Sequence, residues 1–393
     1  MTELLQVVAA LSRAALDGQV SVLATVVRTE GSTYRRIGAR LVAMADGSHV
    51  GAVSAGCMET DVLLRAEAVR AAGTPELMSY DSRSPDDSIW GYGLGCGGMT
   101  ELLLEPLQPE QARAKAQWLR AVAESRRRSV LATVFRASGV GLRPGDQAVL
   151  TDATAILKGF EGIATSVRAA VSSAARLALR AGSSAAVRHV WGDQELDIAH
   201  EVRLPRLRLC LCGAGPDAEP LVAGARRMGW QVTLIDYRPA LISPERWPGV
   251  DCVMVRSPVD LDTAVTAADC DAVVVMNHHF ERDLESLARW LASPVPYIGI
   301  LGPRQRTEQM LATLETRGVP LEGVRERIRA PVGLDIGAET AEEIALAIVA
   351  EIQAAHVGRE GGSLTQRDGP IHEPAQDAHT PVGEANAATL TSG

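Results

Sequence analysis

The chain has 393 residues, of which 46% are hydrophobic and 22% charged, and its formal net charge is −9. This length is too great for one typical core and predicts two or three globular domains. The negative charge argues against a nucleic-acid-binding protein, and no apolar run approaches the roughly 20 residues needed to span a bilayer.

The first 18 residues place apolar side chains at helical spacing, with an acidic residue at position 3. A signal peptide begins with basic residues and ends at a small-residue cleavage site, so this pattern predicts an amphipathic helix. Six cysteines in so long a chain do not indicate a disulfide framework, and without an export signal their thiols should be reduced. We therefore expect a cytoplasmic protein.

Predicted strands and one helix alternate with glycine-rich segments in the first 105 residues. In chain order we expect a strand at 20–27, a glycine-studded loop at 31–38, a strand at 40–44, a short run at 50–54, a helix at 59–72, a glycine-rich segment at 91–98 and a strand at 100–104.

Residues 128–204 resemble a diverged copy of this pattern. The sequence SVLATV at 21–26 recurs at 129–134, and the helix at 62–73 has a counterpart at 171–182, with offsets of 108 and 109. Alanine-rich helices resemble one another by chance, but the matching strand and the nearly constant offset favour duplication. We therefore predict one N-terminal α/β domain over residues 1–204, with an internal repeat at about 20–105 and 128–204. The second copy contains no cysteine, so thiol chemistry belongs to the first.

Residues 205–356 alternate predicted strands and helices. The strands are apolar, which is typical of a parallel sheet covered by helices on both faces. The predicted fold class is therefore α/β, with the duplicated N-terminal domain followed by a Rossmann-type C-terminal domain. Residues 357–393 are polar and rich in glycine and proline without periodicity, and we expect a disordered tail there.

Residues 213–218 fit the pattern G-x-G-x-x-A between a strand and a helix. Gly213 and Gly215 would let the backbone approach a phosphate at the helix N-terminus, and Asp236 ends the next strand where it could accept hydrogen bonds from a ribose diol. The alternative is a loop kept for packing, which Pro216 favours because it lacks an N–H donor.

Two further segments of this domain follow predicted strands, at the edge where open α/β sheets bind ligands. Asn277-His278-His279 follows one strand, and Arg304 and Arg306 follow another. The arginines suit an anion, although arginines that open a helix are more often solvated and loop histidines more often make local hydrogen bonds. Together with the glycine loop, they favour an anion site.

Cys57 and Cys96 are the two cysteines placed for chemistry. Cys57 stands at the start of a predicted helix after Gly56, and Cys96 lies between Gly95 and the pair Gly97-Gly98. A helix N-terminus favours a thiolate, and neighbouring glycines leave a thiol open to a large ligand. The other four cysteines, Cys210, Cys212, Cys252 and Cys270, sit in or beside predicted strands and are expected in the core.

Zinc is not expected at these thiols, because neither has a second cysteine at C-x₂₋₄-C spacing and His49 is the only histidine of this zone. Arg35 and Arg36 lie in the glycine-studded loop beside hydroxyl groups and form a candidate anion clamp. Thiols together with an arginine clamp suit a ligand that is both anionic and thiophilic.

Several long segments resemble the xanthine dehydrogenase accessory (XdhC/CoxI) family. They are GSTYRRIGARLVAMADGSHVGAVSAGCMETDV and WGYGLGCGGMTELLLEPL near the N-terminus, then CGAGPDAEPLV, DAVVVMNHHFERD, YIGILGPRQR and APVGLDIGAETAEEIALAI, in the order the family has them. The resemblance covers roughly residues 10–355. Tyr34, Ala55 and Pro216 stand where the family commonly has proline, glycine and histidine, respectively.

The resemblance implies a molybdenum-cofactor-binding chaperone, an accessory protein rather than a turnover enzyme. Such a protein assists sulfuration of the cofactor, molybdopterin with its metal, and inserts it into a xanthine dehydrogenase-type molybdenum hydroxylase. By resemblance, Cys57 and Cys96 would contact the cofactor or its molybdenum. The neighbouring and Rossmann motif positions would complete the site: Arg35, Arg36, Gly56, Glu59, Gly95, Gly97, Gly98, Gly213, Gly215, Asp236, His278 and Arg304.

The expected partners are an apo molybdenum hydroxylase, a cysteine desulfurase-type sulfur donor and a second copy of the chain in a homodimer, with no nucleic acid or membrane. Two other functions stay open. One is an NAD(P)-dependent oxidoreductase using the glycine loop, although no Tyr-x-x-x-Lys set supplies hydride-transfer chemistry. The other is a recruitment scaffold that binds no cofactor.

Overall fold

The computed structural model describes residues 3–83, 97–152, 158–254, 265–266, 269–366 and 368. They fall into two compact units, an N-terminal unit at Glu3–Pro205 and a C-terminal unit at Arg206–Gly369. No helix in these ranges is long and apolar enough to cross a membrane. The expected tail at 357–393 lies mostly outside the described residues.

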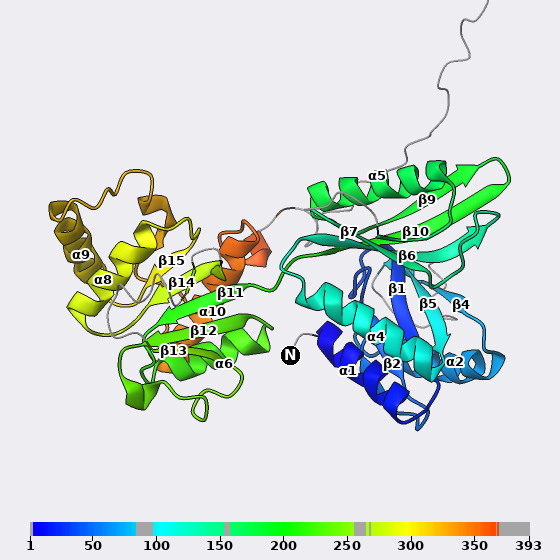
Figure 1. Cartoon of the computed structure of the whole chain (residues 1–393), viewed down its shortest axis with the longest axis horizontal. Helices are drawn as coiled ribbons and strands as arrows, with labels where there is room; N and C mark the ends of the chain where they lie inside the picture. The colour runs from blue at the N-terminus through cyan, green and yellow to red at the C-terminus, as the bar shows by residue number, and fades with distance from the viewer. Residues whose placement is uncertain are drawn as a thin grey trace, which may run out of the picture. The chain divides into compact units, whose positions relative to one another are not determined.

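The N-terminal unit consists of one pattern of helices and strands used twice (Figure 1). The first copy contains α1 (Glu3–Leu16), β1 (Ser21–Gly31), β2 (Arg40–Ala43), β3 (His49–Gly51), α2 (Glu59–Ala72), β4 (Glu76–Asp81) and β5 (Gly98–Leu107). The second contains α4 (Pro109–Glu124), β6 (Ser129–Ser138), β7 (Gln147–Thr151), β8 (Lys158–Gly159), α5 (Thr165–Ala181), β9 (Ala185–Trp191) and β10 (Gln194–Arg203).

Each copy forms one antiparallel sheet, and the strand orders match: β3-β2-β1-β5-β4 in the first and β8-β7-β6-β10-β9 in the second. The irregularities match as well. The β1–β5 register shifts at Val27, and the β6–β10 register shifts at Phe135, which is 108 positions further along the chain. A bulge re-aims side chains and is kept when a fold is copied, so its repetition supports the expected duplication.

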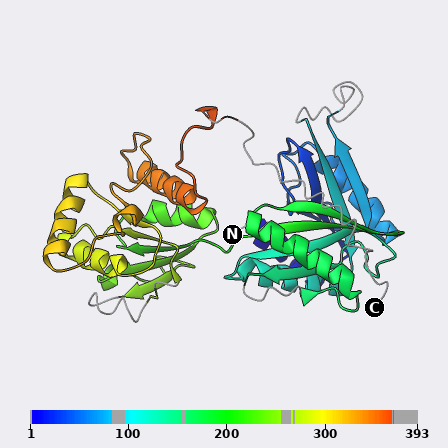
Figure 2. The same ribbon diagram turned by 90° about the horizontal axis from the view of Figure 1, so that it is seen from above.

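Alternating strand residues give each sheet two buried faces. Val22, Ala24 and Val26 of β1 pack beneath α2, and α5 covers the outer face of the second sheet in the same way (Figure 2). On the other faces, Val27 and Phe135 belong to a cluster that joins the two sheets. The helices α1 and α4 pack against each other.

Two buried ion pairs cross between the copies. Arg40 of β2 contacts Glu201 of β10 at 2.6 Å, and Lys115 of α4 contacts Glu105 of β5 at 2.8 Å. These carboxylates occupy equivalent places, because Glu201 lies over Gly38 and Glu105 lies over the corresponding glycine of the second copy, Gly145. A Cβ atom at either glycine would come within 2.6 Å of the carboxylate facing it. The two halves are therefore fitted to each other and do not form independent domains.

His200 of β10 is a titratable group enclosed in the second sheet. It is 0% exposed, and neither ring nitrogen has a hydrogen-bond partner among the described residues. Burial, and to a smaller extent the neighbouring His189, lowers the pKa of His200 to about 3. The folded chain therefore holds this ring neutral at pH values where the unfolded chain protonates it.

We expect stability to fall as the pH drops from about 6.5 towards 3, because the unfolded state binds the extra proton in that window. The loss contributed by this one ring should reach about 2 kcal/mol at pH 5. Urea unfolding between pH 7.5 and 5, followed by hydrogen exchange of β10 peptides, measures it. H200L removes the titration and should flatten the slope; equal slopes in the two proteins would contradict the assignment.

The C-terminal unit is a six-stranded parallel sheet in the order β13-β12-β11-β14-β15-β16, as expected for a Rossmann-type domain. Its strands are β11 (Arg208–Cys212), β12 (Gln231–Asp236), β13 (Asp251–Met254), β14 (Ala272–Val275), β15 (Ile298–Ile300) and β16 (Ile328–Arg329). Its helices are α6 (Ala218–Arg227), α8 (Phe280–Leu291), α9 (Arg304–Thr316) and α10 (Ala341–His356), with short 3₁₀ turns at Pro239–Leu241, Arg325–Arg327 and Leu364–Gln366.

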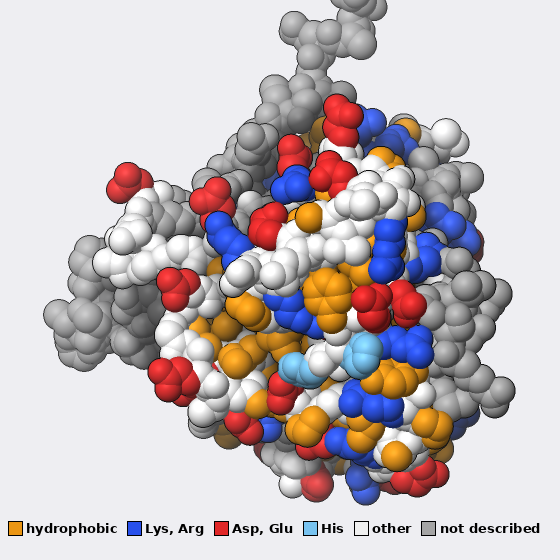
Figure 3. Space-filling view, turned by 90° about the vertical axis from the view of Figure 1, so that its left-hand side faces the viewer, with side chains coloured by type: hydrophobic (Ala, Val, Ile, Leu, Met, Phe, Trp, Pro, Cys, Tyr) orange, Lys and Arg blue, Asp and Glu red, His pale blue; other side chains and the backbone are white. Residues whose placement is uncertain are grey.

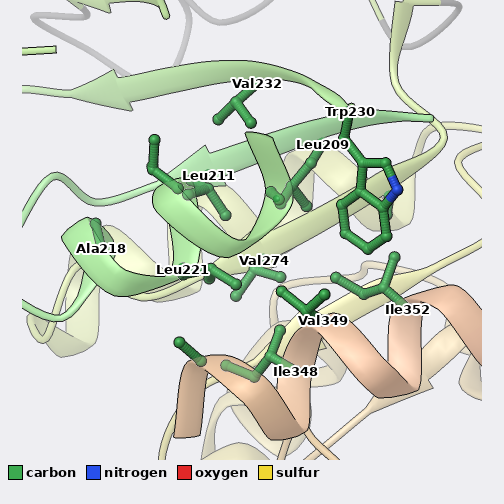
Figure 4. Close-up of a cluster of buried hydrophobic side chains, with 14 of the residues drawn as sticks. Leu209, Leu211, Ala218, Leu221, Trp230, Val232, Val274, Ile348, Val349 and Ile352 are labelled. Atoms are coloured by element: carbon green, nitrogen blue, oxygen red, sulfur yellow. The ribbon is translucent and has the colours of Figure 1, made fainter. Parts of the chain in front are cut away.

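Helices cover both faces of this sheet. Figure 4 shows Leu221 of α6 and Ile348, Val349 and Ile352 of α10 packed beneath the strands. The opposite face packs against α8 and α9, with buried Cys210, Cys212 and Cys270 among its core residues, as expected; Cys252 is half-buried. The strand order reverses between β11 and β14, and ligands of open α/β sheets bind at the carboxyl end of such a point.

Candidate functional site

An open cleft lies in the first copy of the N-terminal unit, between the loop after β1, the segment before α2 and the ends of β4 and β5. Most of its lining side chains carry hydroxyl groups, and they surround one thiol and one guanidinium. The lining residues are Ser32, Thr33, Tyr34, Arg35, Val53, Ser54, Cys57, Met58, Tyr80, Ser82, Gly98 and Thr100.

Cys57 is exposed in this cleft, one residue before Met58, the N-cap residue of α2. The loop that carries it is held by Glu59, whose side chain is buried. One carboxylate oxygen of Glu59 accepts hydrogen bonds from the backbone N–H groups of Val53, at 3.1 Å, and Ser54, at 2.8 Å. The other oxygen accepts from the Ser54 hydroxyl. Glu59 therefore acts on the loop, and the loop presents the thiol.

Ser54 extends this arrangement to the residues on either side of Cys57. Its Oγ accepts hydrogen bonds from the backbone N–H groups of Gly56, at 3.0 Å, and Met58, at 3.1 Å. Gly56 has a φ of 108°, which other residues rarely adopt, while the space beside it is open. Glycine is therefore required at position 56 by the turn of the backbone rather than by lack of room.

The ionised form of Glu59 is the one that fits this network. Burial is the largest single influence and favours the neutral acid, but the hydrogen bonds from Ser54, Val53 and the backbone together lower the pKa below its usual value. A carboxylate that accepts several N–H bonds is stabilised in its charged form. Glu59 is therefore an acceptor at neutral pH.

The structure separates the two arginines that the sequence grouped as a clamp. Arg35 lines the cleft, and its guanidinium pairs with Glu3 of α1, while its Nε has no hydrogen-bond partner in the described part of the chain. Arg36 is exposed and is not among the lining residues. An anion in the cleft would thus meet one guanidinium, which is already held by a carboxylate.

Of the predicted glycine-rich segment, Gly97 and Gly98 are described, whereas Gly95 and Cys96 lie outside the described residues. Gly98 begins β5 where that strand closely approaches the end of β1. A Cβ atom at Gly98 would lie 2.2 Å from the carbonyl oxygen of Ser32. Its backbone N–H also donates to the Ser82 hydroxyl at 3.2 Å. Gly98 therefore brings the cleft walls together, and Gly97 is exposed beside it.

The second copy of the repeat has apolar side chains where the first has the cleft. Leu142 lies in the corresponding loop, which is one residue shorter, and packs against the core of its own half. Val140, the counterpart of Ser32, is 8% exposed, and Phe160, which follows β8, is 6% exposed. Both side chains belong to the hydrophobic core of the second half. The cleft with its exposed thiol lies in the first copy, and the second copy contains no cysteine.

The glycine loop of the C-terminal unit lies at the reversal point of the sheet, but Asp236 is engaged within the protein. Its buried carboxylate accepts hydrogen bonds from the backbone N–H of Ala214, at 2.6 Å, and from Arg238, whose side chain and N–H occupy both oxygens. Burial opposes ionisation most strongly, yet these bonds lower the pKa of Asp236. A ribose would have to compete with Arg238 for this side chain.

Gly213 and Gly215 pack against the segment that follows β14. A Cβ atom at Gly213 would lie 2.4 Å from the carbonyl oxygen of Met276, and one at Gly215 would lie 3.9 Å from the His278 ring. His278 has a φ of 57°, and its Nε2 lies 3.1 Å from the carboxylate of Asp217, the N-cap residue of α6. A carboxylate therefore stands at the helix end where a phosphate would bind.

The remaining residues of this edge are partly exposed. Arg304 is exposed at the start of α9, whereas Arg306 pairs at 2.7 Å with Asp283, which also accepts hydrogen bonds from Asn277. Figure 3 shows basic, acidic, histidine and hydrophobic side chains mixed on one face. Across the described residues, no group of three or more His, Cys, Asp or Glu side chains could hold a metal ion.

The sequence prediction missed the cleft residues contributed by the paired strands β4 and β5. Tyr80 and Ser82 are two residues apart, and Thr100 is the register partner of Tyr80. Their hydroxyl groups are too common in proteins to signal a site. The two-residue spacing places Tyr80 and Ser82 on one face of a strand, but without the strand pairing that face has no partner.

Comparison with known proteins gives two family matches. Residues 209–352 match the model of the XdhC Rossmann domain, and residues 14–81, which include Cys57, match the model of the XdhC and CoxI family. A Bacillus subtilis protein named as a probable xanthine dehydrogenase subunit is 30% identical over 336 residues, which is 86% of this chain and 93% of that protein.

Two further similarities cover almost the same extent. The molybdenum cofactor insertion chaperone PaoD of Escherichia coli is 25% identical over 350 residues, 89% of this chain and 88% of that protein. The crystal structure of a xanthine dehydrogenase from Bacillus halodurans aligns with a TM-score of 0.67 at 28% identity, covering 92% of this chain and 98% of that one.

Proposed function

This chain belongs to the XdhC and CoxI family, and from its cleft we propose that it binds a molybdenum cofactor, assists its sulfuration and inserts it into a xanthine dehydrogenase-type molybdenum hydroxylase. The observation that carries the proposal is the exposed thiol of Cys57 on a loop fixed by Glu59 at the edge of a hydroxyl-lined cleft. The similarity to a protein named as a molybdenum cofactor insertion chaperone also supports this proposal.

The residues of the cleft suit such a ligand. When bound, molybdopterin supplies a metal on a dithiolene, a pterin ring and a phosphate. Cys57 offers a thiol, a soft ligand type that matches the metal and sulfur end. Arg35 offers a guanidinium for the phosphate, with hydroxyl donors around it. We propose Gly56, Gly97 and Glu59 as supporting positions, with Glu59 acting through the loop, and Cys96 as a second thiol contact.

Within this proposal, the chain's own groups bind and orient rather than catalyse. Glu59 and Ser54 keep Cys57 at the cleft edge through five hydrogen bonds to the loop residues 53–58. Arg35 is held by Glu3, so a phosphate would exchange one anionic partner for another. Such an exchange allows release as well as capture, which a delivery protein requires. We assign no binding role to Arg36 beyond a contribution to the local positive charge.

For the C-terminal unit we propose a nucleotide site, either for NAD(P) or for a nucleotide carried by the cofactor, at the loop of Gly213 and Gly215. His278 and Arg304 would contribute from the neighbouring strand ends. Asp236 would support the loop through Ala214 rather than bind directly. The proposed partners are the apo hydroxylase, a cysteine desulfurase-type sulfur donor and a second copy of the chain.

Substitution of Cys57 tests the proposal. After anaerobic purification, we expect C57A to retain roughly tenfold less molybdenum and oxidisable fluorescent pterin than the unmodified protein, by analogy with the loss of metal-site contacts. Activation of an apo hydroxylase should fall in parallel. C252S, which changes a half-buried cysteine of the other unit, serves as the matched control.

Three results would count against the proposal. Unchanged cofactor content and target activation in C57A would show that the thiol has no role. Absence of molybdenum and pterin from the unmodified protein, together with tight NAD(P) binding, would favour the oxidoreductase alternative. Full target activation without bound cofactor would favour a recruitment scaffold.

A further inference from the structure

Tyr34 lines the cleft, and its large, mostly apolar side chain is exposed. It is 70% exposed, although it stands between Thr33 and Arg35 in a well-defined loop. An aromatic ring that loses so little of its surface on folding contributes little to stability. Its position at the cleft therefore calls for a role in recognition.

The backbone on both sides of Tyr34 is fixed. The Thr33 hydroxyl donates to the carbonyl oxygen of Arg35 at 3.0 Å, and the Arg35 side chain is paired with Glu3 of α1. Ser32 is in close backbone approach to Gly98 of β5. Because the flanking residues are held, a ligand that contacts the ring does not have to order the loop first.

The corresponding loop of the second copy carries apolar side chains that turn towards the core. There Leu142 packs against the hydrophobic core of its half, and Val140, the counterpart of Ser32, belongs to that core. The same loop can therefore direct an apolar side chain inward. In the first copy, the loop instead leaves an aromatic ring at the rim of an open cleft that also holds a thiol and a guanidinium.

We propose that Tyr34 is the platform on which the planar pterin ring of the bound cofactor stacks, and that it thereby sets the specificity of the cleft for a flat heterocycle. The inference rests on the proposed function. A tyrosine ring offers a large rigid surface with few rotatable bonds, which suits stacking on a heteroaromatic face. Arg35, the next residue, lines the same cleft and supplies positive charge. Adjacent residues would therefore bind the pterin ring and the phosphate of the cofactor.

The test uses the full-length chain and two probes. One is neopterin monophosphate, a fluorescent phosphorylated pterin without dithiolene or metal; the other is molybdopterin released anaerobically from a molybdenum hydroxylase. Y34L removes the aromatic ring and keeps an apolar side chain of comparable reach. We expect it to weaken the affinity for both probes roughly tenfold and to reduce the quenching of pterin fluorescence, as loss of one stacked base does elsewhere.

Two further variants make the result specific. Y34F keeps the ring and should bind both probes within about twofold of the unmodified protein, since stacking does not need the hydroxyl. L177A, which shortens an exposed apolar side chain on α5 of the other half, should leave affinity unchanged. Circular dichroism of Y34L should match that of the unmodified protein, because an exposed side chain is replaced.

Each remaining outcome overturns the inference in a distinguishable way. If the unmodified protein and Y34L bind both probes equally, Tyr34 is not a platform, while the proposed function stands. If Y34L keeps full affinity but fails to activate the hydroxylase, the ring is a docking contact for the client. If the unmodified protein binds neither probe, the proposed function fails, and the stacking role fails with it.

Discussion

Replacement of Glu201 by alanine is expected to destabilise the N-terminal unit by about 3–5 kcal/mol, because it leaves the buried guanidinium of Arg40 without its carboxylate. The side chains of Arg40 and Glu201 are 2% and 5% exposed, so water cannot take over the role of the partner. Hydrogen exchange of peptides from β2 and β10 in increasing urea measures the loss within this unit.

A double replacement separates the charge from the packing. R40M combined with E201L removes both charges and fills the same space with apolar side chains, so it should recover more than half of the stability lost in E201A. E105A provides the corresponding change at the second crossing ion pair, where Lys115 is 12% exposed and the loss should be smaller. If E201A unfolded no earlier than the unmodified chain, the two halves would not depend on this contact.

The duplication was predictable because the strand at the centre of each sheet retained its sequence. The segments 21–26 and 129–134 are buried on both sides, and burial limits which residues a strand can carry. The strands β4 and β9 and the helix α4 were not predicted. Helix α4 did carry local signals, since Pro109 occupies its first turn and Gln111 caps its start, but its buried stripe is mostly alanine, which is a weak apolar signal.

Only those site residues could be predicted whose chemical type is unusual in its sequence context. Cys57 and Arg35 were identified because thiols and paired arginines are rare in glycine-rich loops, and both line the cleft. The opposite wall depends on the pairing of β1 with β5, which joins residues about 70 positions apart. That pairing, rather than any motif, brings Ser32 to Gly98, so the shape of the cleft could not be read from the sequence.

In the C-terminal loop, the glycine motif predicted the fold correctly. It did not predict which groups of the protein would already occupy the expected ligand-binding side chain. The sequence placed Asp236 at the end of the second strand, and the structure agrees. Arg238, two residues later, takes up that carboxylate, and Asp217 stands at the helix N-terminus. The spacing of a motif predicts the backbone position of a residue, whereas the hydrogen-bond partners of its side chain determine what else that side chain can bind. The ribose contact of Asp236 stays a prediction.

Replacement of Glu59 by alanine is expected to reduce cofactor retention about as much as loss of Cys57, roughly tenfold, although the thiol itself remains. The change removes the acceptor for the N–H groups of Val53 and Ser54 and for the Ser54 hydroxyl. Each buried donor left unsatisfied costs about 1–3 kcal/mol, so the loop should rearrange to expose these groups to water. Hydrogen exchange of the peptide covering residues 50–60 should then show loss of protection.

E59Q distinguishes a positioning role from a general loss of structure. The glutamine keeps one carbonyl oxygen in place, so loop protection and cofactor content should both be intermediate, while exchange in the core strand β1 should be unchanged. The alanine variant should lose protection at 50–60 without any change in β6 or β10, since the second copy does not contact this loop through Glu59. Two observations would refute the argument. One is full loop protection in E59A; the other is a loosened loop that still retains molybdenum and pterin, because the position of Cys57 would then not matter.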